Sequence, residues 1–320
     1  MRSYKEVFDL LHKEVAKVVI GQEEMIQQVF IAILCNGNAL LEGYPGLAKT
    51  LAINTISEIL DLSFARIQGT PDLMPSDITG TSIIEEDRGK RVFKFQKGPI
   101  FNNIVLADEI NRATPKTQSA LLEAMQEKQV SVGNQIQKLD LPFFVLATQN
   151  PIEQEGTYPL PEAQLDRFLL KIKVKYPNEK QELEIVDRFT GNARRATPRK
   201  VLNKERVFFL QNKVLEMPIA NDLKQKAVNL ILLTRNSKNL MLTRNSKNLI
   251  EYGASPRASL ALIMTSKARA LMMGRNHVSS EDIITMAYPV LRHRIIMNFE
   301  AERKGMTTDD AVTELIKKLK

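Results

Sequence analysis

The sequence predicts an α/β domain built on a parallel β-sheet, followed by an all-α domain. Up to residue 174, short apolar runs that suit buried strands alternate with longer segments of helical periodicity. Strands that alternate with helices form parallel sheets, because the helices supply the crossover connections. Residues 201–320 instead hold helical patterns and no convincing strand. We therefore place the α/β domain at residues 1–190, a linker at 191–200 and the helical domain at 201–320.

A turn that contains Gly43 and Gly46 links a short apolar strand at residues 40–42 to the next predicted helix. Its glycines allow successive backbone N–H groups to point at a polyphosphate, and the helix N-terminus adds positive charge. Lys49 would reach the β- and γ-phosphates, and the Thr50 hydroxyl would bind Mg²⁺. Ala48 stands where glycine is usual and is small enough for the start of a helix. The residues expected around the nucleotide are Gly43, Tyr44, Pro45, Gly46, Leu47, Ala48, Lys49, Thr50 and Leu51.

Polar residues follow two other apolar strands. Asp108 and Glu109 come after the run at 103–107, and Asn150 comes after the run at 143–147. Ligands of open α/β sheets bind at the carboxyl ends of the strands, so these side chains should meet at one edge. Asp108 would hold Mg²⁺ through water, and Glu109 would polarise the attacking water. Asn150 would orient that water or touch the γ-phosphate, with an ordinary turn before Pro151 as the alternative.

The other segments predict helices, loops and two β-hairpins. Amphipathic helices are expected at residues 3–17, 23–35, 114–127 and 256–273, with strands at 64–67 and 169–174. Alternating residues on both sides of a turn predict hairpins over 81–97 and 129–137. Residues 69–80 are rich in proline, glycine and aspartate, which predicts a loop. Capping boxes at Ser279 and Thr307 would begin two further helices.

The composition narrows the class of protein. The net charge is +8, with acidic and basic residues both plentiful, as in soluble intracellular proteins. Cys35 is the single cysteine and follows an apolar run, so we expect a buried thiol and no intramolecular disulfide. The three histidines lack the spacing of metal ligands. The N-terminus does not resemble a signal peptide, and no apolar run approaches about 18 residues, so we expect a cytoplasmic protein without a membrane span.

Taken together, these motifs resemble those of the MoxR family of AAA+ ATPases over nearly the whole chain. The matching stretches are Gly-Tyr-Pro-Gly-Leu-Ala-Lys-Thr at 43–50, Asp-Glu-Ile-Asn-Arg-Ala at 108–113, Ala-Thr-Gln-Asn-Pro at 147–151, Asp-Arg-Phe at 166–168 and Gly-Ala-Ser-Pro-Arg at 253–257. The resemblance implies a P-loop NTPase fold with a five-stranded parallel sheet in the order 5-1-4-3-2 and a helical lid. It also implies that the two hairpins are insertions typical of this clade.

The resemblance assigns further roles at the nucleotide site. It implies that Asn150 is the sensor-1 residue and Arg257 the sensor-2 residue. It implies that Arg167 is an arginine finger donated to the ATP of a neighbouring subunit, although a local salt bridge to Asp166 or Glu162 is the alternative. The segment expected beside the adenine ring consists of Val19, Ile20, Gly21 and Gln22.

The family also implies an activity and partners. We expect ATP hydrolysis coupled to chaperone-like remodelling or maturation of partner proteins, in a hexameric ring. Partners with von Willebrand factor A domains would be separate chains, because this chain lacks the Asp-x-Ser-x-Ser motif. One alternative is a DNA-stimulated motor, which the basic charge favours and the lack of aromatic stacking platforms disfavours, so nucleic acid is not an expected partner. Another alternative is a nucleotide-gated scaffold with little turnover, against which the intact Asp108–Glu109 pair argues.

One short stretch is repeated. The sequence Leu-Thr-Arg-Asn-Ser-Lys-Asn-Leu occurs at 233–240 and again at 242–249. A solenoid needs several copies, so a recent tandem duplication or a sequence error is the simpler interpretation. The extra residues lie just before the expected sensor-2 helix, and Arg257 keeps its identity.

Overall fold

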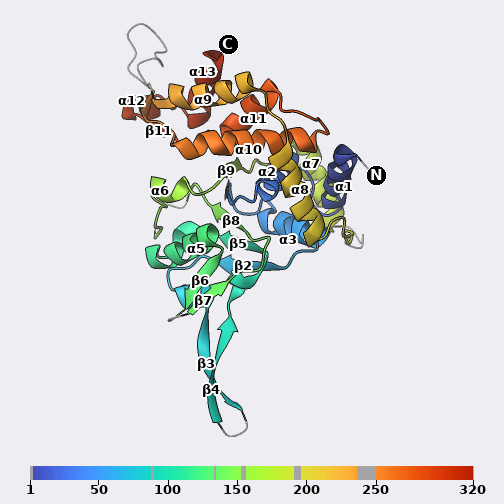
Figure 1. Cartoon of the computed structure of the whole chain (residues 1–320), viewed down its shortest axis with the longest axis vertical. Coiled ribbons are helices and arrows are strands. Elements are labelled where there is room, and N and C mark those ends of the chain that lie inside the picture. Colours follow the sequence, from blue (N-terminus) through green and yellow to red (C-terminus); the bar gives the residue numbers. More distant parts are fainter. Residues whose placement is uncertain are drawn as a thin grey trace.

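The computed structural model has a five-stranded parallel sheet at its centre (Figure 1). The structure describes residues 3–87, 90–132, 135–152, 156–190, 196–235 and 249–319. The strands are β1 (Ala39–Glu42), β2 (Phe64–Gln68), β5 (Ile104–Asp108), β8 (Phe144–Gln149) and β9 (Leu170–Lys173). Their order is β2-β5-β8-β1-β9, which confirms the order 5-1-4-3-2 when it is read from β9. All neighbours are parallel, so the five carboxyl ends share one edge.

Both faces of the sheet are buried. Side chains of a strand alternate between the faces, and on β1 Ala39 and Leu41 join one apolar cluster while Leu40 joins the other. The central strands β5 and β8 divide their side chains in the same way. This double burial explains why these strands appear in the sequence as continuous apolar runs rather than alternating ones.

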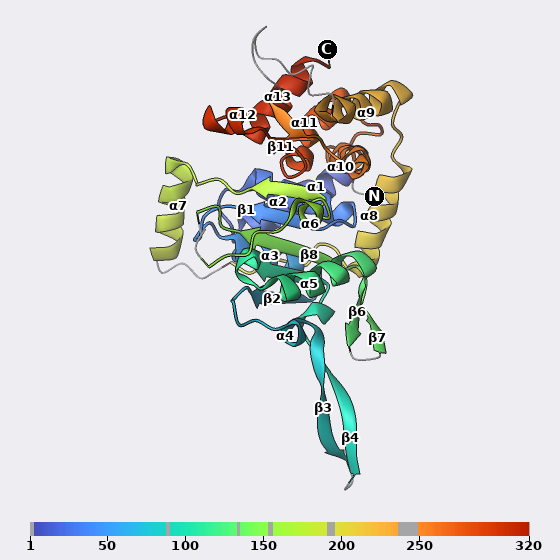
Figure 2. The same cartoon turned by 90° about the vertical axis from the view of Figure 1, so that its left-hand side faces the viewer.

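Helices cover both faces. The first face packs against α1 (Tyr4–Ala16), α2 (Glu23–Leu34) and α3 (Lys49–Ile59), and the second against α5 (Pro115–Glu127). A capping box of Ser3 and Glu6 begins α1, and Pro115 occupies the first turn of α5 as expected. Two further helices, α6 (Glu162–Leu165) and α7 (Glu179–Thr190), flank β9 in the sequence. Figure 2 shows α7 at the side of the molecule, and none of its residues is buried.

Two antiparallel hairpins extend from the body (Figure 2). They pair β3 (Gly80–Asp87) with β4 (Lys90–Lys97), and β6 (Gln129–Val132) with β7 (Gln135–Lys138), which confirms both predicted hairpins. The turn residues 88–89 and 133–134 lie outside the described residues. The predicted loop over 69–80 is wrong near its end, where α4 (Pro75–Thr79) forms a short helix. Proline suits its first turn, and Asp77 accepts a hydrogen bond from the Met74 N–H at 2.8 Å.

The C-terminal region is mainly helical. Its helices are α8 (Lys204–Glu216), α9 (Asn221–Arg235), α10 (Pro256–Met272), α11 (Ser280–Leu291), α12 (Phe299–Arg303) and α13 (Thr308–Lys317). The capping boxes at Ser279 and Thr307 are confirmed. The expectation that this region holds no strand is wrong, since β10 (Ile250–Tyr252) pairs with β11 (Ile296–Met297). Strands this short contain too few residues to give a periodic signal.

Two expectations fall partly outside the described residues. The repeated stretch begins at the end of α9, but its residues 236–248 are not described. Residues 191–195 of the expected linker are also not described, and residues 196–200 contain no helix or strand.

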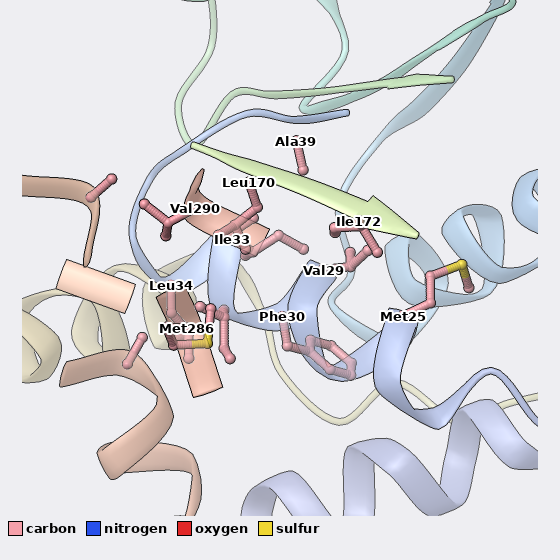
Figure 3. Packing of buried hydrophobic residues seen from close by; sticks show 14 of the residues in the cluster. Met25, Val29, Phe30, Ile33, Leu34, Ala39, Leu170, Ile172, Met286 and Val290 are labelled. Carbon is pink, nitrogen blue, oxygen red and sulfur yellow. The ribbon is translucent and has the colours of Figure 1, made fainter. Parts of the chain in front are cut away.

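One apolar cluster joins the sheet to the C-terminal helices. Figure 3 shows α2 in this position, with Val29 near Ile172 of β9 and Leu34 near Met286 of α11. The cluster continues into α8, α9 and α10. The lid is therefore packed onto the body through α2 rather than attached only by the chain.

The surroundings of the cysteine and of two histidines, and the lengths of the helices, bear on expectations from the composition. Cys35 is half-buried, and burial raises the pKa of its thiol. His293 is buried, and His12 packs edge-on against Phe30, so both side chains are part of the packing of the fold. In the part of the chain that is described, no helix is both long and apolar enough to cross a membrane.

Candidate nucleotide-binding site

The turn after β1 has backbone angles that suit an anion-binding loop. Gly46 has a φ of 81° and Ala48 a φ of 56°, both in the left-handed region. The helix α3 begins directly afterwards at Lys49, so its unpaired N–H groups face the turn. The small size of Ala48 is thus only part of its explanation. The position also requires a left-handed backbone, which costs a residue other than glycine about 1–2 kcal/mol.

A hollow of about 380 Å³ lies at this turn. Lys49 turns back toward the loop, and its Nζ donates a hydrogen bond to the Gly43 carbonyl oxygen at 2.6 Å. The lining brings together residues from four strand ends, namely Pro45, Gly46, Leu47, Ala48, Lys49, Thr50, Leu51, Arg66, Asp108, Glu109 and Asn150. The predicted phosphate loop, the two predicted carboxylates and Asn150 therefore share one hollow.

Thr148 positions the acidic pair. Its Oγ1 donates to Asp108 Oδ1 at 2.5 Å and accepts from the Glu109 N–H at 2.8 Å. Glu109 has a φ of 53°, a strained conformation for a residue other than glycine. Gly69 makes this turn possible, because a Cβ there would lie 2.1 Å from the Glu109 carbonyl oxygen. The edge strand and the acidic strand approach closely, which fixes where both carboxylates lie.

Three polar side chains donate hydrogen bonds to the carboxylates of Asp108 and Glu109. Arg66 donates to Asp108 Oδ2 through Nε at 3.0 Å and through Nη2 at 2.6 Å. Gln68 Nε2 and Arg112 Nη1 donate to Glu109 Oε2 at 2.9 and 3.1 Å. Arg66 also donates to the side-chain oxygen of Gln68. The negative charges at this edge are therefore balanced by arginines from β2 and from the segment after β5.

The residues of the hollow fit a Mg²⁺ ion that phosphate oxygens and water complete. Mg²⁺ in proteins usually takes one or two carboxylates together with substrate phosphates. The hollow offers the Asp108 carboxylate and the Thr50 hydroxyl. Within the described ranges, no three His, Cys, Asp or Glu side chains gather into a metal site made of protein alone. The donor set thus suits a metal that arrives with a nucleotide.

The segment expected beside the adenine lies outside the lining of the phosphate hollow. Val19 is buried, while Gly21 and Gln22 have left-handed backbones with φ of 69° and 64°. Gln22 Nε2 donates to the Lys175 carbonyl oxygen at 2.9 Å and lines a hollow of about 160 Å³. A larger hollow of about 550 Å³ is lined by Val18, Leu51 and Phe189, among others. Leu51 lines both this hollow and the phosphate hollow.

Arg167 and Arg257 lie outside the phosphate hollow. Arg167 is exposed and makes no ion pair with any described residue, which argues against the alternative of a local salt bridge. Arg257 Nη1 lies 3.4 Å from Asp166 Oδ2, and its side chain is 58% exposed. Asp166 also accepts from Ser255 Oγ at 3.0 Å and from Arg294 Nε at 2.9 Å. The expected sensor-2 residue and the residue before the expected finger are thus joined at the seam between body and lid.

Sequence reasoning missed Arg66, Gln68, Arg112 and the role of Thr148. A signal existed for β2, because Arg66 and Gln68 are polar residues at the end of a strand of the same sheet. That strand ends without an acidic motif, so its polar residues were not singled out. Thr148 lay within the matching stretch at 147–151, but its contact with Asp108 depends on strand register.

Comparisons with known proteins agree with the fold. Residues 38–170 match the family described as "ATPase family associated with various cellular activities (AAA)", and residues 242–315 match an AAA lid domain. The chain is 42% identical to Chaperone MoxR1 of Mycobacterium tuberculosis over 90% of this chain and 75% of that protein. It is 28% identical to Protein MoxR of Methylorubrum extorquens over 97% of this chain and 94% of that protein.

A solved structure is also similar. A crystal structure of a Cytophaga hutchinsonii protein, provisionally described as an ATPase, has a TM-score of 0.90 and 45% sequence identity. The match covers 98% of this chain and 94% of that chain. The agreement extends over both the sheet and the helical region.

Proposed function

Because the chain belongs to the MoxR family of AAA+ ATPases, we propose that it hydrolyses ATP to ADP and phosphate to remodel or mature partner proteins. The observation that carries this proposal is the single hollow that contains the phosphate-binding turn, the acidic pair and Asn150. A turn at a helix N-terminus binds phosphate, and an adjacent carboxylate can activate water for attack on it. The names Chaperone MoxR1 and Protein MoxR do not refer to DNA, so these relatives give no support to a DNA-stimulated motor.

Each residue of the hollow has a role in this reaction. Lys49 and the N–H groups at the start of α3 would bind the β- and γ-phosphates. Thr50 and Asp108 would hold Mg²⁺, which supplies positive charge to the phosphates. Glu109 would accept a proton from the attacking water, and Asn150 would orient that water. Asn150 Oδ1 accepts a hydrogen bond from the Ile152 N–H at 3.2 Å. This bond holds the orientation of the Asn150 side chain, including its N–H₂ group.

The proposal includes an active site completed by another subunit. Arg167 is an exposed guanidinium near the seam, and a second copy could receive it at its phosphate hollow. Charge on the transferred phosphoryl group is stabilised by such fingers. We propose a hexameric ring on this basis and on family membership, with von Willebrand factor A domain proteins as partners. Arg257, as sensor 2, would have to leave Asp166 to reach the phosphates of its own subunit.

Phosphate release from Mg–ATP by the purified protein tests the proposed reaction. Lys49→Ala should lose nucleotide binding, because the phosphates lose their main fixed positive charge. Binding of a fluorescent ATP analogue, measured beside phosphate release, separates lost binding from lost turnover, and a cooperative melting transition shows that the variant is folded. Wild-type turnover by Lys49→Ala would refute the assignment of this hollow.

A trapping experiment tests the coupling to partner proteins. Glu109→Gln with ATP should hold its clients, because a state that binds ATP without hydrolysing it cannot release them by turnover. Mass spectrometry of co-purified proteins, with Lys49→Ala as the matched control, identifies what is trapped. Identical proteins on both variants would contradict nucleotide-dependent client binding.

A further inference from the structure

Arg66 binds Asp108, the first residue of the acidic pair, from the edge strand of the sheet. The register of β2 and β5 sets Gln68 beside Asp108, with Arg66 two residues earlier. Arg66 directs two N–H donors at Asp108 Oδ2, at 3.0 and 2.6 Å. Thr148 Oγ1 donates to the other oxygen, Oδ1, at 2.5 Å. Three protein donors are therefore directed at one carboxylate.

This arrangement competes with a metal ion. An ionised carboxylate offers about four lone-pair sites, and here three of them accept from the protein. Mg²⁺ needs these lone pairs either for itself or for the water molecules around it. A guanidinium on the same oxygen also repels a divalent cation. Arg66 and Mg²⁺ cannot both use Asp108 in this way.

We propose that Arg66 is a gate on the metal site, which keeps free divalent cations off Asp108 and yields only to a metal that arrives with a triphosphate. A free cation that displaced Arg66 would leave two positive groups together with one carboxylate. A metal–triphosphate complex brings phosphate oxygens that accept the released guanidinium. The proposal rests on the proposed function, because it assigns Asp108 to Mg²⁺.

Two features of Arg66 suit such an exchange. Its side chain is 48% exposed, so the guanidinium can leave Asp108 for water without opening the fold. Arg66 also lines the hollow that holds the phosphate-binding turn. The released guanidinium therefore stays in the compartment where a triphosphate would lie. A purely structural arginine would be buried and tied to backbone carbonyls, as Arg294 is.

Mn²⁺ binding to the protein without nucleotide tests the gate, with the electron paramagnetic resonance signal of free Mn²⁺ as the readout. Wild type should bind Mn²⁺ weakly, and Arg66→Ala should bind one ion per chain about tenfold more tightly, the scale of a lost charged hydrogen bond. Lys94→Ala, which removes one positive charge from a hairpin, is the matched control and should resemble wild type. Arg66→Ala combined with Asp108→Asn should lose the gain.

The outcomes separate this proposal from the proposed function. Equal Mn²⁺ affinity of wild type and Arg66→Ala overturns the gate, whatever the ATPase assay gives. Tight binding that survives Asp108→Asn also overturns it, because the ion then lies elsewhere. A tightened site in a protein that releases no phosphate from ATP would instead refute the ATPase function and leave the gate intact. If Arg66→Ala lacks a cooperative melting transition, Arg66→Met keeps an apolar stem, removes both the charge and the N–H donors, and carries the same expectation.

Discussion

The sheet edge and the seam between body and lid hold charged side chains in opposite ways. At the sheet edge, Asp108 and Glu109 are paired with Arg66 and Arg112, whose side chains are 48% and 43% exposed. At the seam, Asp166 is paired with Arg294, whose side chain is only 3% exposed. The arginines of the first kind are partly exposed to solvent, whereas Arg294 is buried in the fold. Under the proposed function, the difference separates residues beside the reaction from residues that hold the two parts together.

Arg294 stabilises the seam between body and lid because each of its side-chain nitrogens donates a hydrogen bond. Its Nε donates to Asp166 Oδ1, its Nη1 to the carbonyl oxygens of Val290 and Leu169, and its Nη2 to those of Phe168 and Asp166. One side chain thus ties the end of α11 to the start of β9. The residue after Asp166 is the exposed Arg167, so the seam fixes the backbone from which that side chain projects.

The largest expected effect follows from that projection. Arg167→Ala should bind ATP and lose about 10³-fold or more in turnover, because an arginine finger is worth about that factor. Lys49→Ala should neither bind nor hydrolyse, yet it still carries an intact Arg167. Mixing the two variants should restore part of the activity, increasingly at higher protein concentration, as measured by phosphate release. If mixed assemblies form and stay inactive, Arg167 does not act on a neighbour.

Stability measurements test whether buried and exposed ion pairs contribute differently to the fold. Arg294→Met should lower the free energy of unfolding by about 3–5 kcal/mol, because it leaves Asp166 and several carbonyl groups without their buried partner. Arg257→Ala removes an exposed partner of the same carboxylate and should cost at most about 1 kcal/mol. Urea denaturation of both variants gives the two values. Equal losses would show that the seam does not depend on the buried pair.

A smaller effect should appear at acid pH. Burial, and next the charge of Arg294, hold the pKa of His293 well below its usual value of 6.5, so His293 is neutral in the folded protein. The unfolded chain binds a proton there below pH 6.5, and stability should fall as the pH falls from 7 to 5, by about 1–2 kcal/mol. Urea denaturation at several pH values measures this slope. His293→Gln should flatten it, and an unchanged slope would assign the effect to other groups.

Sequence patterns predicted most of the fold because local and global signals agree in the body. The strands are buried on both faces and therefore appear as apolar runs, and the turn between β1 and α3 has a recognisable spacing. The strands β10 and β11 were not predicted, because two or three residues contain no period. The short helix α4 was hidden by its proline, which begins a helix as readily as it ends one.

In the candidate site, too, residues that belong to local motifs were predicted, and residues whose contacts depend on strand register or on tertiary packing were not. The hollow combines the residues of the phosphate turn with Asp108, Glu109 and Asn150, all of which carry strong motifs. Arg66 and Thr148 could not be assigned roles, since their contacts depend on the register of β2, β5 and β8. Asp166 was noted within a motif, but its bond to Arg294 joins positions 128 residues apart. Contacts of that kind follow from the packing of the lid and have no local signal.

The most direct test of the account is a paired measurement on Glu109→Gln. Glutamine keeps the size of the side chain and one acceptor oxygen but cannot accept a proton from the attacking water. The account predicts wild-type affinity for a fluorescent ATP analogue together with phosphate release lowered by at least about 10²-fold. Wild-type phosphate release by Glu109→Gln would contradict the claim that the acidic pair at this sheet edge performs the hydrolysis.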